Sequence, residues 1–187
     1  MVATENDELA KKLRLLRSHG MDSLTWDRFR GHSFTYDVTI PGFNFRMDDI
    51  RASLLRVQLR SLNRVNRLRE ERVNWYRQLL GRDPRWTVPF DDYPGTPAYH
   101  LFTVVLAEGS RRHEIMRYLK AEGIQTSIHY PPIHQFRCYR KLAPVQPDLK
   151  NTNQLGLRIL SLPLFPKMTF EQVKLVCDCF KDALDNG

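Results

Sequence analysis

The fold of this chain is decided by the stretch MDDIRASLLRVQLRSLNRVNRLREERVNWYRQLL, which runs from Met47 to Leu80. It contains no Gly or Pro, and its Leu, Ile and Val residues recur at the three- and four-residue spacings of one helix face. Asp48 and Asp49 lie in the first turn, where the helix dipole favours negative charge. At the α-helical rise per residue, the stretch spans about 50 Å. A helix of that length predicts a bridge between two domains.

The segment before this helix predicts one shorter helix and a long loop. Residues 6–18 have the apolar periodicity of an amphipathic helix, with Asn6 as the N-cap and Gly20 just after its end. Residues 21–43 lack helical periodicity, so we expect a loop there, with a short strand near Tyr36–Ile40.

The segment after the long helix alternates between strand and helix patterns. Gly81–Pro97 is rich in Pro, Gly and Asp, and predicts a connection with one strand around Trp86–Pro89. The β-branched and aromatic run at 100–106 predicts a strand, and Thr169 predicts the N-cap of a final helix. The full set of expected elements is strands at 100–106, 124–129 and 161–164 and helices at 111–122, 153–160 and 169–184. This order is typical of a small α/β or α+β domain.

The composition excludes several classes of protein. The 187 residues are 42% hydrophobic, which is too much for a disordered chain. No apolar run reaches the length needed to cross a bilayer, and the first residues do not have the pattern of a secretory signal. The three cysteines, Cys138, Cys177 and Cys179, are too few for a disulfide framework, so we expect a reducing compartment such as the cytoplasm. Cys177 and Cys179 point to different sides of a helix, which argues against a metal site.

The formal net charge of +8 is concentrated in arginines of the long helix. Arg56, Arg60, Arg64 and Arg67 recur at spacings of 4, 4 and 3, which places them along one stripe. Such a stripe can bind a phosphate backbone, although a solvated helix face has the same pattern. An alternative function is therefore a non-enzymatic module that dimerises or binds nucleic acid, although nucleic acid is the less favoured partner.

The loop PGFNFRMDD, residues 41–49, presents an amide and a guanidinium just before a helix begins. A helix N-terminus attracts anions, and the side chains of Asn44 and Arg46 are donors suited to a phosphate. In the alternative interpretation, Asn44 only caps the helix and Arg46 is a surface residue.

A second polar group is predicted at the end of the strand expected at 124–129. His129 and Tyr130 precede a rigid Pro131–Pro132 turn, which projects both rings from the scaffold. His129 suits general acid–base chemistry or a hydrogen bond to a ligand, and it suits equally a structural histidine. A metal pair with His134 lacks an evident third ligand, so no metal is predicted.

Four motifs, in this order along the chain, make the sequence resemble a known family. They are VATENDELAKKLRLLRSHG at 2–20, PGFNFRMDDIRASLLRVQL at 41–59, EGIQTSIHYPPIH at 122–134 and LSLPLFP at 160–166. Together they resemble the DegT/StrS family of aminotransferases, which depend on pyridoxal phosphate and act on keto sugars, usually linked to nucleotides. The resemblance implies the C-terminal part of a type I aspartate-aminotransferase-like fold. Residues 1–46 would be a remnant of the large cofactor-binding domain, 47–80 the interdomain helix and 81–187 the small domain.

The resemblance also implies site residues and a partner. Family members are homodimers with active sites at the subunit boundary. Asn44 would reach the cofactor phosphate of the neighbouring subunit, and Arg46 would contact the phosphate side of the nucleotide sugar. His129 and Tyr130 would approach the substrate from the partner chain.

The chain departs from the family pattern at its start. The lysine that carries the cofactor in the family would lie shortly before the counterpart of Val2, and the eight lysines here all lie downstream. We therefore expect the chain alone to bind pyridoxal phosphate weakly or not at all and to be inactive, with no catalytic residue of its own. It would pair with a missing N-terminal half or form a homodimer. The uncovered apolar faces would make it oligomeric or poorly soluble. A family member that dehydrates its substrate remains an alternative, because that lysine decides between the two reactions.

Overall fold

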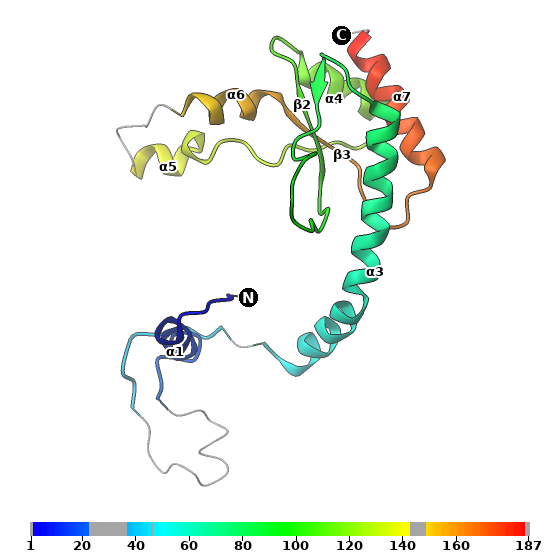
Figure 1. Cartoon of the computed structure of the whole chain (residues 1–187). Coiled ribbons are helices and arrows are strands. Elements are labelled where there is room, and N and C mark those ends of the chain that lie inside the picture. Colours follow the sequence, from blue (N-terminus) through cyan, green and yellow to red (C-terminus); the bar gives the residue numbers. More distant parts are fainter. Residues whose placement is uncertain (1, 23–36, 46, 143–148, 186–187) are drawn as a thin grey trace. The chain divides into compact units, whose positions relative to one another are not determined.

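A computed structural model of the chain describes residues 2–22, 37–45, 47–142 and 149–185 (Figure 1). Two compact units make up the chain, residues 1–60 and residues 61–187. The boundary falls inside the long helix α3 (Asp49–Leu80), after Arg60.

Unit 1 begins with helix α1 (Asp7–Leu16), which confirms the helix predicted for this segment. The side chain of Asn6 accepts a hydrogen bond of 2.9 Å from the Leu9 N–H, so it caps the helix as expected. After α1 the chain turns at Gly20, which has a φ of 71°. A Cβ at this position would lie 1.7 Å from the Ile40 carbonyl oxygen, so the turn needs glycine.

The chain after α1 is held to residues 43–45 by backbone hydrogen bonds. The Phe43 N–H donates to the Leu16 oxygen, and the Phe45 N–H donates to the Arg17 oxygen at 2.9 Å. Ser18 and Asn44 form an isolated β-bridge, and so do Met21 and Val38. The strand predicted near Tyr36–Ile40 is therefore a single bridge at Val38 within the described residues, and Tyr36 itself lies outside them.

Helix α3 confirms the long helix read from the sequence, starting two residues later than expected. The Asp48 carboxylate accepts a hydrogen bond of 2.8 Å from the Arg51 N–H, which makes Asp48 a cap and not part of the helix. The sequence assigned all of 47–80 to the connection between domains. The C-terminal half of α3 nevertheless buries Val73, Tyr76 and Leu80 in the core of unit 2.

Unit 2 is built on an antiparallel sheet in the order β1 (Trp86–Thr87), β2 (Phe102–Leu106) and β3 (Ile159–Leu162). The strands at 86–89 and 100–106 are thus confirmed with shorter bounds. Along β2, Phe102, Val104 and Leu106 are buried and alternate with half-buried residues, because successive side chains of a strand point to opposite faces.

Two further helices complete the core of unit 2, α4 (Arg112–Ala121) and α7 (Phe170–Asp185), which pack together beside the sheet (Figure 1). Both were expected from the sequence. Thr169 and Gln172 cap α7 reciprocally, because each backbone N–H donates to the other side chain. Aromatic rings join the layers: Tyr76 stacks on Phe102 and Trp86 meets Phe180 edge to face.

The prediction of a strand at Ile124–His129 is wrong. This segment touches β3 through one isolated bridge, between Ser127 and Ser161. Strand β3 covers Ile159–Leu162, two residues earlier than the predicted 161–164, and it ends before Pro163, which has no N–H to continue a ladder.

The remaining helices of unit 2 lie between α4 and β3 in the sequence. Helix α6 (Lys150–Arg158) begins three residues before the helix predicted at 153–160. The 3-10 turn η1 (Ile133–Gln135) and helix α5 (Arg137–Leu142) were not predicted, because segments this short carry almost no periodic signal.

Candidate functional site

Asn44 lies in unit 1 with its side chain exposed. Its backbone is fixed by the bridge to Ser18 and by the flanking bonds of Phe43 and Phe45. Among the described residues the Asn44 side-chain amide has no hydrogen-bond partner, so its N–H groups are available to an external acceptor. Asn44 is also four residues away from Asp48, which caps α3, so the alternative in which Asn44 is only the cap of that helix is wrong. A positioned, exposed amide fits one contact to a phosphate group such as that of pyridoxal phosphate. Arg46 lies outside the described residues.

His129 lies in unit 2, half-buried, in the segment that touches β3. Its Nδ1 is 2.9 Å from the Oγ of Ser161, which is buried in the middle of β3. The Ser161 Oγ lies 3.3 Å from the Thr103 Oγ1 on β2. Within the described residues, Nε2 of His129 has no partner. The histidine is therefore held on one ring nitrogen and open on the other.

Tyr130 is the neighbour that the sequence predicted beside His129. The two rings meet edge to face with centroids 4.9 Å apart, and the peptide bond between the residues is cis. Tyr130 is strongly exposed, so its phenol points to solvent and can reach a ligand. The structure brings these two predicted residues together as one polar group.

His134, the other histidine of this segment, has a structural partner. Its Nε2 lies 2.8 Å from the Asn153 Oδ1 on α6, and the Gln135 amide donates to the same oxygen at 2.7 Å. These bonds tie η1 to α6. In the parts of the chain that the structure describes, no group of three metal-ligating side chains comes together.

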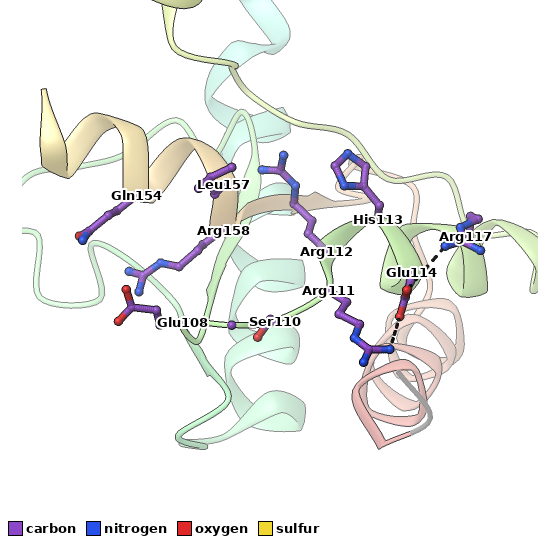
Figure 2. Close-up of a pocket in the computed structure, with 11 residues that line it drawn as sticks. Glu108, Ser110, Arg111, Arg112, His113, Glu114, Arg117, Gln154, Leu157 and Arg158 are labelled. Carbon is purple, nitrogen blue, oxygen red and sulfur yellow. Dashed lines mark hydrogen bonds and ion pairs between the residues drawn. The ribbon is translucent and has the colours of Figure 1, made fainter.

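A separate pocket of about 430 Å³ lies in unit 2 between the start of α4 and helix α6 (Figure 2). Four of its eleven lining residues are arginines, and none of the residues predicted for a site takes part. Figure 2 shows Arg111 and Arg117 directed at Glu114, at N···O distances of 3.2 and 3.9 Å. These exposed ion pairs neutralise part of the charge and contribute little to stability.

Arg112, which also lines the pocket, is mainly structural. Its guanidinium is buried and donates to the carbonyl oxygens of Gly156 and Ile159, which closes the C-terminal end of α6. Burial lowers the pKa of Arg112 below its ordinary value. The pocket therefore contains an arginine that anchors α6 to α4, and this side chain is already engaged.

The arginine stripe of α3 is exposed at all four positions, Arg56, Arg60, Arg64 and Arg67. Among the described residues these side chains form no ion pair. No described helix is both long and apolar enough to span a membrane.

The site residue that sequence reasoning missed is Ser161. It belongs to the motif LSLPLFP, which carried the resemblance, but no role was assigned to it. The available signal was a serine inside an apolar strand, where a buried hydroxyl needs a partner. Which side chain provides that partner depends on the bridge between Ser127 and β3, which the local pattern does not show.

The geometry is that of a mixed α/β chain with an exposed amide in one unit and a histidine–tyrosine pair in the other. The model of the DegT/DnrJ/EryC1/StrS aminotransferase family matches residues 1–181. The chain belongs to this family.

Three similar proteins illustrate the match. The spore coat polysaccharide biosynthesis protein SpsC of Bacillus subtilis is 34% identical over 190 residues, covering 98% of this chain and 49% of SpsC. The solved structure of Helicobacter pylori PseC, an aminotransferase involved in the biosynthesis of pseudoaminic acid, has a TM-score of 0.86 at 25% identity, covering 98% of this chain and 48% of PseC. DesV of S. venezuelae, solved with a ketimine intermediate, has a TM-score of 0.79 at 31% identity, covering 96% of this chain and 45% of DesV. The chain therefore spans about half the length of the proteins it matches.

Proposed function

We propose that this chain forms the C-terminal part of a pyridoxal-phosphate-dependent aminotransferase that acts on keto sugars carried on nucleotides. The observation that carries the proposal is the family match over residues 1–181, together with its coverage of about half of each relative. In this proposal the chain supplies the small domain, the interdomain helix 47–80 and the adjoining edge of an aspartate-aminotransferase-like large domain.

Asn44 and Arg46 are the residues that we assign to phosphate groups. Asn44 would donate its amide to the cofactor phosphate in the neighbouring subunit, which its exposure and fixed backbone support. Arg46 would contact the phosphates of the nucleotide sugar, an assignment that rests on the resemblance. When bound, pyridoxal phosphate supplies the electron sink that amino transfer requires.

His129 and Tyr130 are assigned to the substrate across the subunit boundary. Two observations support this assignment: the two rings are in contact, and each side chain is at least partly exposed to solvent. A half-buried imidazole and an exposed phenol are suited to hydrogen bonds with the hydroxyl, keto or phosphate oxygens of a sugar nucleotide. Their role is to bind and orient the substrate.

The partner in this proposal is a second copy of the enzyme. Unit 1 leaves several large apolar side chains exposed, among them Phe45, Ile50, Leu54 and Leu59. Exposed apolar surface of this extent is typical of an interface. We assign it to contacts with the large domain and with the second subunit.

We also propose that the enzyme works in the cytoplasm. Cys138, Cys177 and Cys179 are all free thiols, and Cys138 is exposed. Exposed free thiols persist best in a reducing compartment.

The first test asks where the cofactor lysine lies. Reading the coding sequence upstream of Met1 should reveal a segment with that lysine, and an upstream sequence without one would contradict the proposal. Incubation of the 187-residue chain with pyridoxal phosphate, followed by borohydride reduction and mass spectrometry, should give only low, scattered modification of its lysines. A stoichiometric adduct on one lysine would show that the chain is not inactive by itself.

The second test addresses Asn44. Binding of pyridoxal phosphate to the dimeric enzyme should weaken several-fold in Asn44→Ala, because one charge-assisted hydrogen bond is lost. Asn63→Ala is the matched control, since Asn63 is an exposed asparagine on α3 to which the proposal gives no role. Equal affinity in the two variants would remove Asn44 from the site.

A further inference from the structure

We infer that Ser161 is a positioning residue for His129, which it holds with the ring proton on Nε2 and that N–H directed to an oxygen of the substrate. The substrate role of His129 rests on the function proposed above. The contact between His129 and Ser161 is a property of this chain and can be measured without any substrate.

The first step is that the Ser161 hydroxyl is fixed in place. Ser161 is only 3% exposed and lies inside β3. Its backbone exchanges two hydrogen bonds with Ser127, at 2.8 and 3.1 Å, and its partner across the sheet is Thr103. Backbone pairing on both sides fixes the Cβ of Ser161, and burial together with the contact to the Thr103 Oγ1 restricts the rotation of its Oγ.

The second step is that the same pairing brings His129 to the hydroxyl. Ser127 precedes His129 by two residues, so the bridge sets the start of the His129–Tyr130 segment against β3. The Nδ1 of His129 then lies 2.9 Å from the Ser161 Oγ, which is ordinary hydrogen-bond distance.

The third step assigns the protons. If Thr103 donates to Ser161 and Ser161 donates to Nδ1, both hydroxyl protons are used, over distances of 3.3 and 2.9 Å. In the reverse order, Nδ1–H of His129 donates to Ser161 and Ser161 donates to Thr103, and the hydroxyl proton of Thr103 then has no acceptor among the residues described. Because half-buried hydroxyls lose free energy when unpaired, the first order is favoured. The proton of the neutral imidazole therefore sits on Nε2.

The consequence is a donor of fixed direction beside Tyr130. An imidazole that already accepts on Nδ1 presents Nε2–H as its remaining group, and this N–H binds an oxygen that carries negative charge. A keto oxygen or a phosphate oxygen of a sugar nucleotide has this chemistry. Ser161 thus acts through His129 and does not itself touch the substrate.

Nitrogen-15 NMR of the histidine rings tests the inference on the full chain. At a pH of about 8.5 an ordinary imidazole is neutral, and the nitrogen shifts report how the proton divides between Nδ1 and Nε2. In the wild-type chain, the share of His129 with its proton on Nδ1 should be about fivefold lower than that of His100, an exposed histidine that serves as internal reference. In Ser161→Ala this share should rise to the level of His100.

Two further variants separate positioning from folding. Ser127→Ala is the matched control, because Ser127 pairs with Ser161 only through its backbone, and it should leave the His129 signals unchanged. Thr103→Val keeps the volume of the side chain and should also keep the proton on Nε2, since Ser161 still donates. Ser161→Thr restores a hydroxyl and should restore the wild-type shifts.

Equal tautomer ratios in wild type and Ser161→Ala would overturn the inference, and so would a shift of the proton to Nδ1 in Thr103→Val. These results do not depend on the cofactor lysine. If the His129 tautomer depends on Ser161 but the coding sequence contains no cofactor lysine, the contact between Ser161 and His129 is established and the proposed aminotransferase function is rejected.

Discussion

The two halves of α3 have the same sequence pattern and opposite surroundings. In the N-terminal half, Ile50 is 76% exposed and Leu59 is 70% exposed. In the C-terminal half, Val73 and Tyr76 are 2% and 0% exposed. Apolar periodicity therefore indicates which face of a helix is to be buried, but it does not say whether residues of the same chain pack against that face.

The C-terminal half of α3 packs into the core of unit 2. Tyr76 stacks on Phe102 of β2 at 4.3 Å and donates its hydroxyl proton to the Pro163 oxygen at 2.7 Å. The N-terminal half belongs to unit 1, whose described helix α1 buries no residue at all. We expect unit 2 to determine the measured stability of the chain and the apolar face of unit 1 to determine its association.

The largest effect should come from a leucine inside unit 2. Leu119 of α4 is fully buried, so Leu119→Ala removes apolar contacts and leaves a cavity. We expect a loss of about 2–5 kcal/mol in the free energy of unfolding, measured by urea denaturation. A loss below about 1 kcal/mol would show that the core of unit 2 is not closed as described.

Tyr76 tests the junction between α3 and the sheet. Tyr76→Phe keeps the stacked ring and removes the hydroxyl, which leaves the Pro163 carbonyl without that donor. The expected cost is about 1–2 kcal/mol by the same measurement. An unchanged free energy of unfolding would mean that water replaces the hydroxyl, and that this end of α3 is more open than unit 2 as a whole.

A buried thiol makes unit 2 sensitive to alkali. Burial raises the pKa of Cys177 from an ordinary 9.0 to about 12. The unfolded chain therefore loses this proton first, so the stability contribution is complete below pH 9 and is lost as the pH rises through 12. One unit above the unfolded pKa the loss is about 1.4 kcal/mol.

Urea denaturation at about pH 8 and about pH 10 measures this loss, with Cys177→Ala as the comparison. The variant should lose less stability between the two conditions, because it has no thiol to ionise. Identical losses would show that Cys177 ionises as easily in the folded chain as in the unfolded one.

The smallest effect should come from the matched leucine in unit 1. Leu59→Ala changes the same side chain as Leu119→Ala, also in a helix, but at an exposed position. We expect a change within about 0.5 kcal/mol. If this substitution cost as much as Leu119→Ala at a protein concentration where sizing chromatography shows a monomer, the N-terminal half of α3 would be buried within the chain itself.

The elements with local signals were predicted well. Asn6 and Thr169 cap helices where the sequence placed them, and α3 is uninterrupted. The strand at 124–129 was wrong because its β-branched residues show a strand preference but not whether a partner pairs with them, and in the fold only Ser127 pairs, through one bridge to Ser161. Segments as short as η1 and α5 have no period to detect.

The candidate site was predictable in part. His129 and Tyr130 were found, and their rings do meet. Ser161, which holds His129, was beyond sequence reasoning, because the contact joins residues 32 positions apart. Arg46 lies outside the described residues, so its role stays a prediction.

The sequence by itself determined the longer helices α1, α3, α4 and α7, the caps at Asn6 and Thr169 and the membership of the family, because these depend on residue order over short spans and on motifs at fixed distances. Only the tertiary structure decided which half of α3 is buried, where β3 ends and which hydroxyl reaches the Nδ1 of His129. Burial and side-chain hydrogen bonds depend on what the folded chain places opposite each residue. A local sequence pattern indicates that a residue requires a packing or hydrogen-bond partner, but it does not identify which residue that partner is.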